Sequence, residues 1–229
     1  MKARRTADDV EEPWDADEAF RRLREAVRER PRAAVFELRD RGFGAPFQVL
    51  VASLISARTR DEVTLRVSLR LFAEAPTPGD VLKLEAADLA ERIRPATFAE
   101  TKARDVLEIA RRVRDERDGE VPATMEGLTA FRGVGPKIAA LTLAVAFGIP
   151  IVPVDVHVHR IVNRWGLVAT RTPERTMTAL EEVLPRRYWI ETNELLVPFG
   201  KFVCTGTAPR CSTCPLRSMC RRVGVTSSR

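Results

Sequence analysis

All four cysteines of this 229-residue chain lie within one stretch of 17 residues near its C-terminal end. They are Cys204, Cys211, Cys214 and Cys220, in the stretch CTGTAPRCSTCPLRSMC, and their spacing is C-x6-C-x2-C-x5-C. The stretch is too short and too polar to bury four thiols as simple apolar side chains. Structural disulfides are rare in reducing compartments, so the spacing predicts a metal centre held by four thiolates.

The spacing is compatible with two kinds of metal centre. Tetrahedral zinc sites usually use two C-x2-C pairs separated by a longer loop, and this stretch has one such pair. A single compact run of cysteines suits an iron–sulfur cluster better, so we favour the cluster, with zinc and free thiols as the alternatives. Arg210 and neighbouring arginines make the loop basic, which serves either solubility or contact with phosphates.

The charge of the chain suggests a polyanionic partner. The formal net charge is +6 and the sequence pI is about 9.6, which favours nucleic acid, although an arginine-rich surface alone would give the same numbers. No run of apolar residues is long enough to span a membrane, and the first twenty residues contain no apolar signal-peptide core. We therefore expect an intracellular protein in a DNA-containing compartment, without membrane contact.

The hydrophobic pattern predicts an all-α fold. Phe20, Leu23 and Val27 share one helical face, and prolines and glycines recur at intervals that suit short helices. Neither strand-turn-strand signals nor Asn-Gly hairpins occur. Residues 63–71 alternate with a period of two and would suit a strand, but a single strand has no partner, so a helix is preferred there.

The stretch LTAFRGVGPKIAA, residues 128–140, predicts two helices joined by a tight turn. Gly133, Val134 and Gly135 supply the turn, and Pro136 suits the first position of a new helix that should end at Gly148. Such a helix-hairpin-helix directs unpaired backbone N–H groups at an anion, for example a DNA phosphate. The candidate phosphate contacts are Arg132, Gly133, Val134 and Gly135.

Lys137 is an unusual choice of cation in this chain. Only five of its 38 basic residues are lysines, and this one follows the turn in the first helical turn, where the helix dipole disfavours a protonated amine. A neutral amine can attack an aldehyde-like sugar carbon and form a Schiff base, whereas a guanidinium stays protonated. Lys137 is therefore a candidate nucleophile, and a lysine that only contacts phosphate is the alternative.

Asp155 is the candidate partner of Lys137. The extended segment IPIVPV can run back along the preceding helix, which allows Asp155 to lie beside the lysine. Asp155 also precedes a helical pattern, VHVHRIVNRW, so it suits an N-cap. A capping aspartate near a bound sugar can stabilise positive charge at the anomeric carbon and relay protons, so both roles are compatible.

Three features together, LTAFRGVGPKIA, VDVH at 154–157 and the cysteine tail, resemble the endonuclease III family of helix-hairpin-helix base-excision DNA glycosylases. The resemblance extends from about Pro46 to Cys220. It implies a [4Fe–4S] cluster on the four cysteines, Lys137 as the Schiff-base nucleophile and Asp155 as the catalytic carboxylate. It also implies excision of oxidised pyrimidines from damaged duplex DNA and cleavage of the abasic site by β-elimination, by a protein expected to be monomeric.

The resemblance also implies two lobes. We expect a flexible N-terminal extension at 1–16, an N-terminal helix of the cluster lobe at 17–39 and a barrel of six helices at 40–150. The hairpin at 128–148 belongs to this barrel, and the rest of the cluster lobe occupies 151–229, with the cluster loop at 204–220.

The chain departs from the family pattern at residues that fill the gap left by an extruded base. LISAR places Arg58 where the family has glutamine, and TFAETKA has Thr97 and Ala99 around Phe98. Arg58, Phe98 and Lys102 are further candidate DNA contacts, and we expect a narrowed range of lesions. The alternative functions are mainly abasic-site lyase, monofunctional mismatch glycosylase and non-catalytic DNA-binding module.

Overall fold

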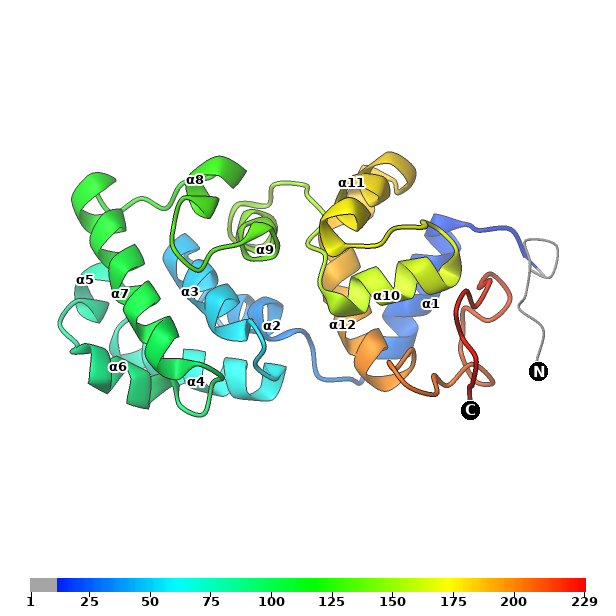
Figure 1. Cartoon of the computed structure of the whole chain (residues 1–229), viewed down its shortest axis with the longest axis horizontal. Helices are drawn as coiled ribbons and strands as arrows, with labels where there is room; N and C mark the ends of the chain where they lie inside the picture. Colours follow the sequence, from blue (N-terminus) through cyan, green and yellow to red (C-terminus); the bar gives the residue numbers. More distant parts are fainter. Residues whose placement is uncertain (1–11) are drawn as a thin grey trace. The chain divides into compact units, whose positions relative to one another are not determined.

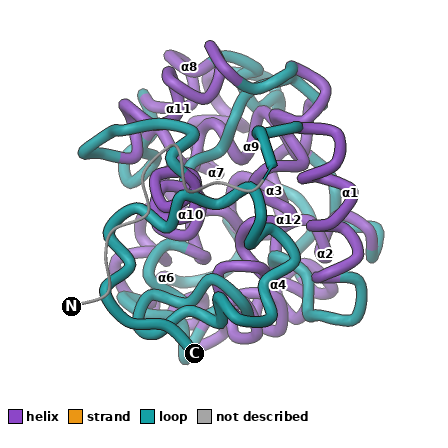
Figure 2. The backbone as a smooth tube through the Cα atoms, turned by 90° about the vertical axis from the view of Figure 1, so that its right-hand side faces the viewer, coloured by secondary structure: helices purple, strands orange, loops and turns teal. Residues whose placement is uncertain are grey.

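A computed structural model describes residues 12–229 of the chain. This part of the chain is built from helices and loops and contains no strand, as the colouring of Figure 2 shows. The predicted all-α class is therefore confirmed. The ambiguous residues 63–71 lie in α4 (Asp61–Glu74), where Val63, Val67 and Leu71 are buried at helical spacing. Leu65 and Leu69, on the other face of this helix, are only half-buried.

Residues 34–149 form one compact unit, which contains the predicted hairpin. Its helices, in chain order, are α2 (Ala34–Asp40), α3 (Pro46–Ser56), α4, α5 (Pro78–Val81), α6 (Ala86–Ile93), α7 (Ala99–Glu116), α8 (Met125–Thr129) and α9 (Pro136–Phe147).

Helix α3 is the centre of this unit. Every residue from Phe47 to Ile55 is buried, because α3 packs against α2, α4, α7 and α9 (Figure 1). Helix α9 is also buried on most of its circumference, from Ile138 to Val145. A helix that is apolar all round needs neighbours on every side. The central position of α3 and α9 therefore fixes the start of α9, where the hairpin ends.

Residues 12–33 and 150–229 belong to the second unit. Its helices are α1 (Ala16–Val27), α10 (Val156–Trp165), α11 (Pro173–Val183), the short 3-10 helix η2 (Arg186–Tyr188) and α12 (Trp189–Phe202). Phe20, Ile161 and Phe199 are fully buried in its core, and the segment with the cysteines packs against this core. Helix α1 and the cysteine segment, which lie far apart in the sequence, thus share one hydrophobic cluster.

The units meet in the sequence between Ala33 and Ala34 and between Ile149 and Pro150. The expected boundary at residue 39 lies inside α2, which packs against α3 and α4, so residues 34–39 belong with the hairpin unit. Most of the expected N-terminal extension, residues 1–11, lies outside the described residues, and α1 begins at Ala16. None of the helices described is long and apolar enough to cross a membrane.

Candidate active site

The predicted hairpin is present between α8 and α9. Gly133 has the left-handed φ of +80°, Gly135 caps α9 with an extended backbone, and Pro136 is its first residue. The side chain of Val134 is buried, and its N–H donates to the carbonyl of Phe131 at 3.2 Å. Within the part of the chain that the structure describes, the N–H groups of Gly133 and Gly135 have no acceptor. Two unpaired donors thus flank the tip of the turn.

A buried acidic side chain contacts the hairpin turn. Asp105, on α7, is buried, and a Cβ atom built on Gly133 would lie 2.8 Å from its Oδ2. Arg132 donates to Oδ1 of Asp105 at 2.6 Å, and Glu108 lies 3.3 Å from the same guanidinium nitrogen. Since more than half of the Arg132 side chain is exposed, it remains accessible to an anion while it links the turn to α7.

Lys137 occupies the second position of α9, directly behind the turn. Its side chain is half-buried, and its Nζ has no hydrogen-bond or ion-pair partner among the described residues. The N–H groups in this first turn of α9 lack intrahelical acceptors, as at any helix start. The amine therefore stands beside backbone donors and the positive end of the helix dipole, which is an environment suited to a phosphodiester.

The structure corrects the expectation that Lys102 contacts DNA. Lys102 is only 6% exposed, and its Nζ donates to the carbonyls of Ile55 and Ala57 and to Oγ1 of Thr59 at 2.6, 2.7 and 3.0 Å. Burial, and in second place the charge of Lys137, lower the pKa of Lys102 from 10.5 to about 8. An ammonium with three internal acceptors has no donor left for a phosphate.

Arg58 and Phe98, the other two expected DNA contacts of this unit, lie on neighbouring loops. Both side chains are exposed, and the guanidinium carbon of Arg58 lies 5.9 Å from the centre of the Phe98 ring. Both residues adopt left-handed backbone conformations, with φ of +56° and +59°. Thr97 and Ala99, which flank Phe98, are exposed and buried respectively.

Asp155 belongs to the second unit, where it is the N-cap of α10, as the sequence predicts. Its Oδ1 accepts from the N–H groups of His157 and Val158, both at 2.9 Å. The preceding extended segment is held by Asn193, whose side chain donates to the carbonyl of Pro153 at 3.0 Å. One carboxylate oxygen thus caps the helix, and the other, Oδ2, accepts no hydrogen bond from the other described residues.

Comparison with known proteins identifies the family. A family model described as HhH-GPD superfamily base excision DNA repair protein matches residues 51–186. Endonuclease III of Thermotoga maritima is 41% identical over 175 residues, covering 76% of this chain and 82% of that protein. The chain belongs to the endonuclease III family.

Three further similarities agree with this family. Endonuclease III-like protein 1 of Bos taurus is 41% identical over 177 residues, and the match spans 76% of this chain and 58% of the bovine protein. A solved non-covalent endonuclease III–DNA complex has a TM-score of 0.77 at 28% identity, and covers 91% of this chain and 96% of that one. A trapped covalent endonuclease III–DNA intermediate has a TM-score of 0.75 at 28% identity, with coverages of 91% and 97%.

The four cysteines of this endonuclease III family member are all half-buried and unpaired, and three of them pack against the core of the second unit. Burial raises the pKa of Cys214 to about 12 and that of Cys220 to about 11, and in both cases the charges of the other cysteines raise it further. Among residues 12–229 no group of three or more side chains has the arrangement of a metal site. Arg210 lies in this segment and is exposed.

Sequence reasoning missed Asp105 and assigned Lys102 to the wrong role. Asp105 and the buried state of Lys102 both carried a signal, because Lys102, Val106, Ile109 and Val113 share the apolar face of α7. A lysine or aspartate on such a face is buried only if it finds partners.

Proposed function

We propose that this chain is a base-excision DNA glycosylase that removes oxidised pyrimidines from duplex DNA and cleaves the resulting abasic site by β-elimination. The observation that carries the proposal is the amine of Lys137, which has no partner among residues 12–229 and lies in the first turn of α9, behind the hairpin. The names of the related proteins, endonuclease III and its DNA complexes, support the same reaction.

Lys137 supplies the nucleophile. Its neutral amine attacks C1′ of the extruded nucleotide, a C–N bond forms there, and the bond from C1′ to the damaged base breaks with transfer of a proton to the base. The C1′–O4′ bond then breaks, O4′ takes up a proton from water, and the opened sugar is left as a protonated Schiff base. Loss of a proton from C2′ then expels the 3′ phosphate by β-elimination, and water hydrolyses the Schiff base to regenerate the amine.

Asp155 supplies the charge and the proton relay in this proposal. Its Oδ1 is fixed by the α10 backbone, so the carboxylate has a defined orientation before substrate binds. A carboxylate of this kind stabilises the cationic character that develops at C1′ when the base departs. In this proposal it also serves as the general base of the reaction.

The hairpin binds the DNA backbone without reading sequence. The unpaired N–H groups of Gly133 and Gly135 and the exposed part of Arg132 provide donors for one or two phosphates. The side chain of Val134 is buried, so its part is to hold the turn rather than to touch DNA. Arg210 adds positive charge on the second unit and is proposed as a further phosphate contact.

The donor set of the cysteine segment fits a [4Fe–4S] cluster, which we propose as the cofactor. Backbone N–H of Arg222 donates to the Cys220 sulfur at 3.4 Å, and Nη1 of Arg164 donates to the Cys204 sulfur at 3.5 Å. Such N–H···S bonds stabilise thiolates bound to iron. Cys204, Cys211, Cys214 and Cys220 would hold the cluster, which supplies a covalent link across this segment when bound.

Borohydride reduction tests the proposal, because it converts a Schiff base on abasic DNA into a stable covalent adduct. We expect wild-type protein to form the adduct and Lys137→Ala to form none. Lys83→Ala is the matched control: Lys83 belongs to the same unit, is exposed and pairs only with Asp80 on the surface. An adduct that survives Lys137→Ala would contradict the assignment.

A second candidate, an enzyme that acts mainly on abasic sites, is favoured by one observation. Arg58 lies against Phe98 at the position where the family has a glutamine, so base recognition differs while Lys137 is intact. Abasic DNA needs less base recognition than a damaged pyrimidine. Duplexes with thymine glycol, dihydrouracil or an abasic site separate the two, since excision of both lesions at the rate of abasic cleavage excludes the narrower function. We also propose that the protein is a monomer and acts in the compartment that contains DNA.

A further inference from the structure

The backbones of Arg58 and Phe98 have left-handed conformations that residues other than glycine rarely adopt. A left-handed backbone costs a non-glycine residue on the order of 1 kcal/mol, so it persists only where surrounding contacts impose it. Here two such residues lie on adjacent loops and place a guanidinium over an aromatic ring. The loops therefore need an anchor that keeps both backbones in place.

The first anchor joins the two loops directly. Oγ1 of Thr97 donates to the carbonyl of Arg58 at 2.8 Å, and the N–H of Thr97 donates to Oγ1 of Thr59 at 3.2 Å. Both bonds use the residue next to Phe98 and the residues at or next to Arg58. A shift of one loop is thus transmitted to the other.

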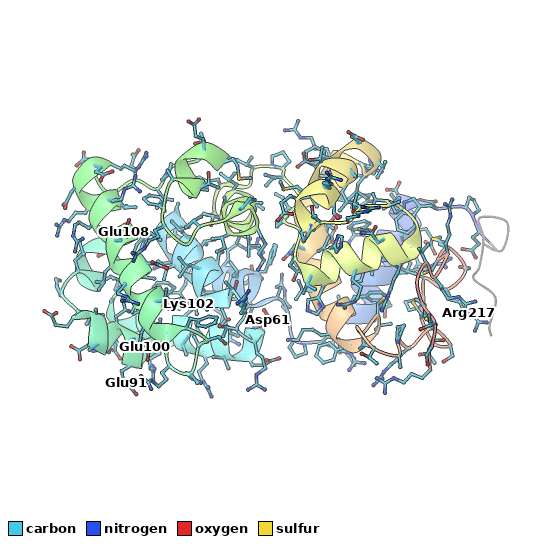
Figure 3. The ribbon with its side chains drawn as sticks, in the orientation of Figure 1. Asp61, Glu91, Glu100, Lys102, Glu108 and Arg217 are labelled. Carbon is cyan, nitrogen blue, oxygen red and sulfur yellow. The ribbon has the colours of Figure 1, made fainter. Side chains whose placement is uncertain are left out.

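The second anchor is the ammonium of Lys102. Figure 3 shows Lys102 on α7, where it lies against the end of α3. Two of its acceptors, the carbonyls of Ile55 and Ala57, are at the C-terminal end of α3, where carbonyls lack helical partners and a cation is favourable. The third acceptor is Thr59, which also accepts from Thr97. One buried charge therefore holds the residues on both sides of Arg58 and, through Thr59, the Phe98 loop.

We propose that Lys102 is a positioning residue: it fixes the two loops together, so that Arg58 and Phe98 fill the gap that an extruded nucleotide leaves beside the unpaired base. The inference rests on the proposed function, since it needs a bound duplex. The partner is a base left without its complement: the exposed Phe98 ring provides a face for stacking, and the guanidinium provides donors for a base edge. Lys102 acts through these two residues and does not touch DNA.

The test uses a duplex with a stable tetrahydrofuran abasic analogue and 2-aminopurine as the opposite base, whose fluorescence rises when it is unstacked. This readout needs no chemical step. With full-length protein at saturation, we expect wild type to raise the fluorescence, and Lys102→Met to lose most of the rise while binding within about threefold of wild type, because phosphate contacts supply the affinity. Lys83→Met is the matched control and should behave as wild type.

Thr97→Val is the second variant, because it removes the hydroxyl donor to Arg58 and keeps the shape of the side chain. We expect the fluorescence rise to fall by about a half or more, since the hydrogen bond that joins the two loops is lost and the pair is held less firmly. This variant keeps the proposal testable if Lys102→Met does not fold. Wild-type fluorescence in either folded variant, or no rise with wild type, would overturn the inference.

The outcomes separate this inference from the function on which it rests. Failure of the function is read from borohydride trapping, as a missing adduct with wild-type protein. Failure of the inference is read from fluorescence alone, with the adduct still formed. A variant that loses DNA binding and fluorescence together, to the same extent, points to a purely structural Lys102 and also overturns it.

Discussion

Gly133 and Gly135 flank the same turn but are glycines for different reasons. Gly133 has a positive φ and lies against Asp105, so any side chain meets both backbone strain and a steric clash. Gly135 has an extended backbone, and a Cβ atom built there meets nothing within 4 Å. The fold thus requires glycine at 133, whereas at 135 the missing side chain leaves space in front of the helix start.

Replacing each glycine separates folding from DNA binding. Serine is a favourable N-cap, so Gly135→Ser should keep or raise the unfolding temperature, while it weakens binding to an abasic-analogue duplex by about tenfold because it fills this space and uses the free donors. Gly133→Ser should lower the unfolding temperature by several degrees, at a cost of about 1–3 kcal/mol. Thermal melts and fluorescence anisotropy measure both. Unchanged binding by Gly135→Ser would remove the hairpin from the proposed interface.

Lys102 predicts a pH dependence of stability. Its pKa is lowered to about 8, against 10.5 for an ordinary lysine, so between these values the unfolded chain binds the proton and the folded chain does not. The contribution of Lys102 to the free energy of unfolding therefore rises as pH increases from about 8 to about 10.5, and is lost as pH falls through 8. Urea unfolding of wild type and Lys102→Met at pH 7.5 and 10 measures it. A difference between the two proteins that is the same at both pH values contradicts the prediction.

At the scale of single elements, local sequence signals located α9 and α10 well. Pro136 and Gly148 bound α9, and Asp155 and Gly166 cap α10, as local capping preferences predict. The period-two pattern of residues 63–71 looks like a strand, but α4 buries two adjacent positions in each turn, one of them polar at Thr64 and Ser68. Burial therefore follows the helix and not the alternation of apolar residues. Lys102 depends on the end of α3, Asp105 on the hairpin turn, and Arg58 and Phe98 on bonds between their two loops. These contacts join distant parts of the sequence, so no local pattern contains them.

Asp155 has two assigned roles, as the N-cap of α10 and as the catalytic carboxylate, and substitutions can separate them. Asparagine caps a helix about as well as aspartate, so Asp155→Asn should keep the unfolding temperature within about 2 °C of wild type. The amide has no charge to stabilise a developing cation, so base excision should fall by about 100-fold or more. Asp155→Ala should lose both activity and stability. Thermal melts and single-turnover excision decide, and full activity in Asp155→Asn would leave Asp155 as a cap only.

At the scale of the whole molecule, the cysteine segment is part of the hydrophobic core of the second unit. Residues from the first described helix, from α12 and from the cysteine segment share one core, although they lie far apart in the sequence. The spacing of the cysteines predicts a metal centre, but it contains no information on this packing. Sequence patterns do not show which distant segments share a core, so this packing could not be predicted.

If the proposed cluster is bound, the packing of the cysteine segment on this core depends on iron. Protein purified under reducing conditions should be brown and contain about four iron atoms per chain. Cys214→Ser should lower the iron content and the visible absorbance, and should also lower the unfolding temperature, because Cys214 packs against the core. Metal analysis and absorbance spectra measure this. Stoichiometric zinc in a colourless preparation would contradict the cluster.

The most direct measurement is the location of the covalent link to DNA. Trypsin cleaves after Lys137 in the free protein but not after a lysine reduced onto a sugar, so trapping on abasic DNA should produce a joined peptide spanning residues 133–160. Mass spectrometry of the digested adduct should find the sugar on Lys137 in this peptide. Modification of any other lysine, with residues 133–137 and 138–160 recovered separately and unmodified, would contradict the proposed nucleophile.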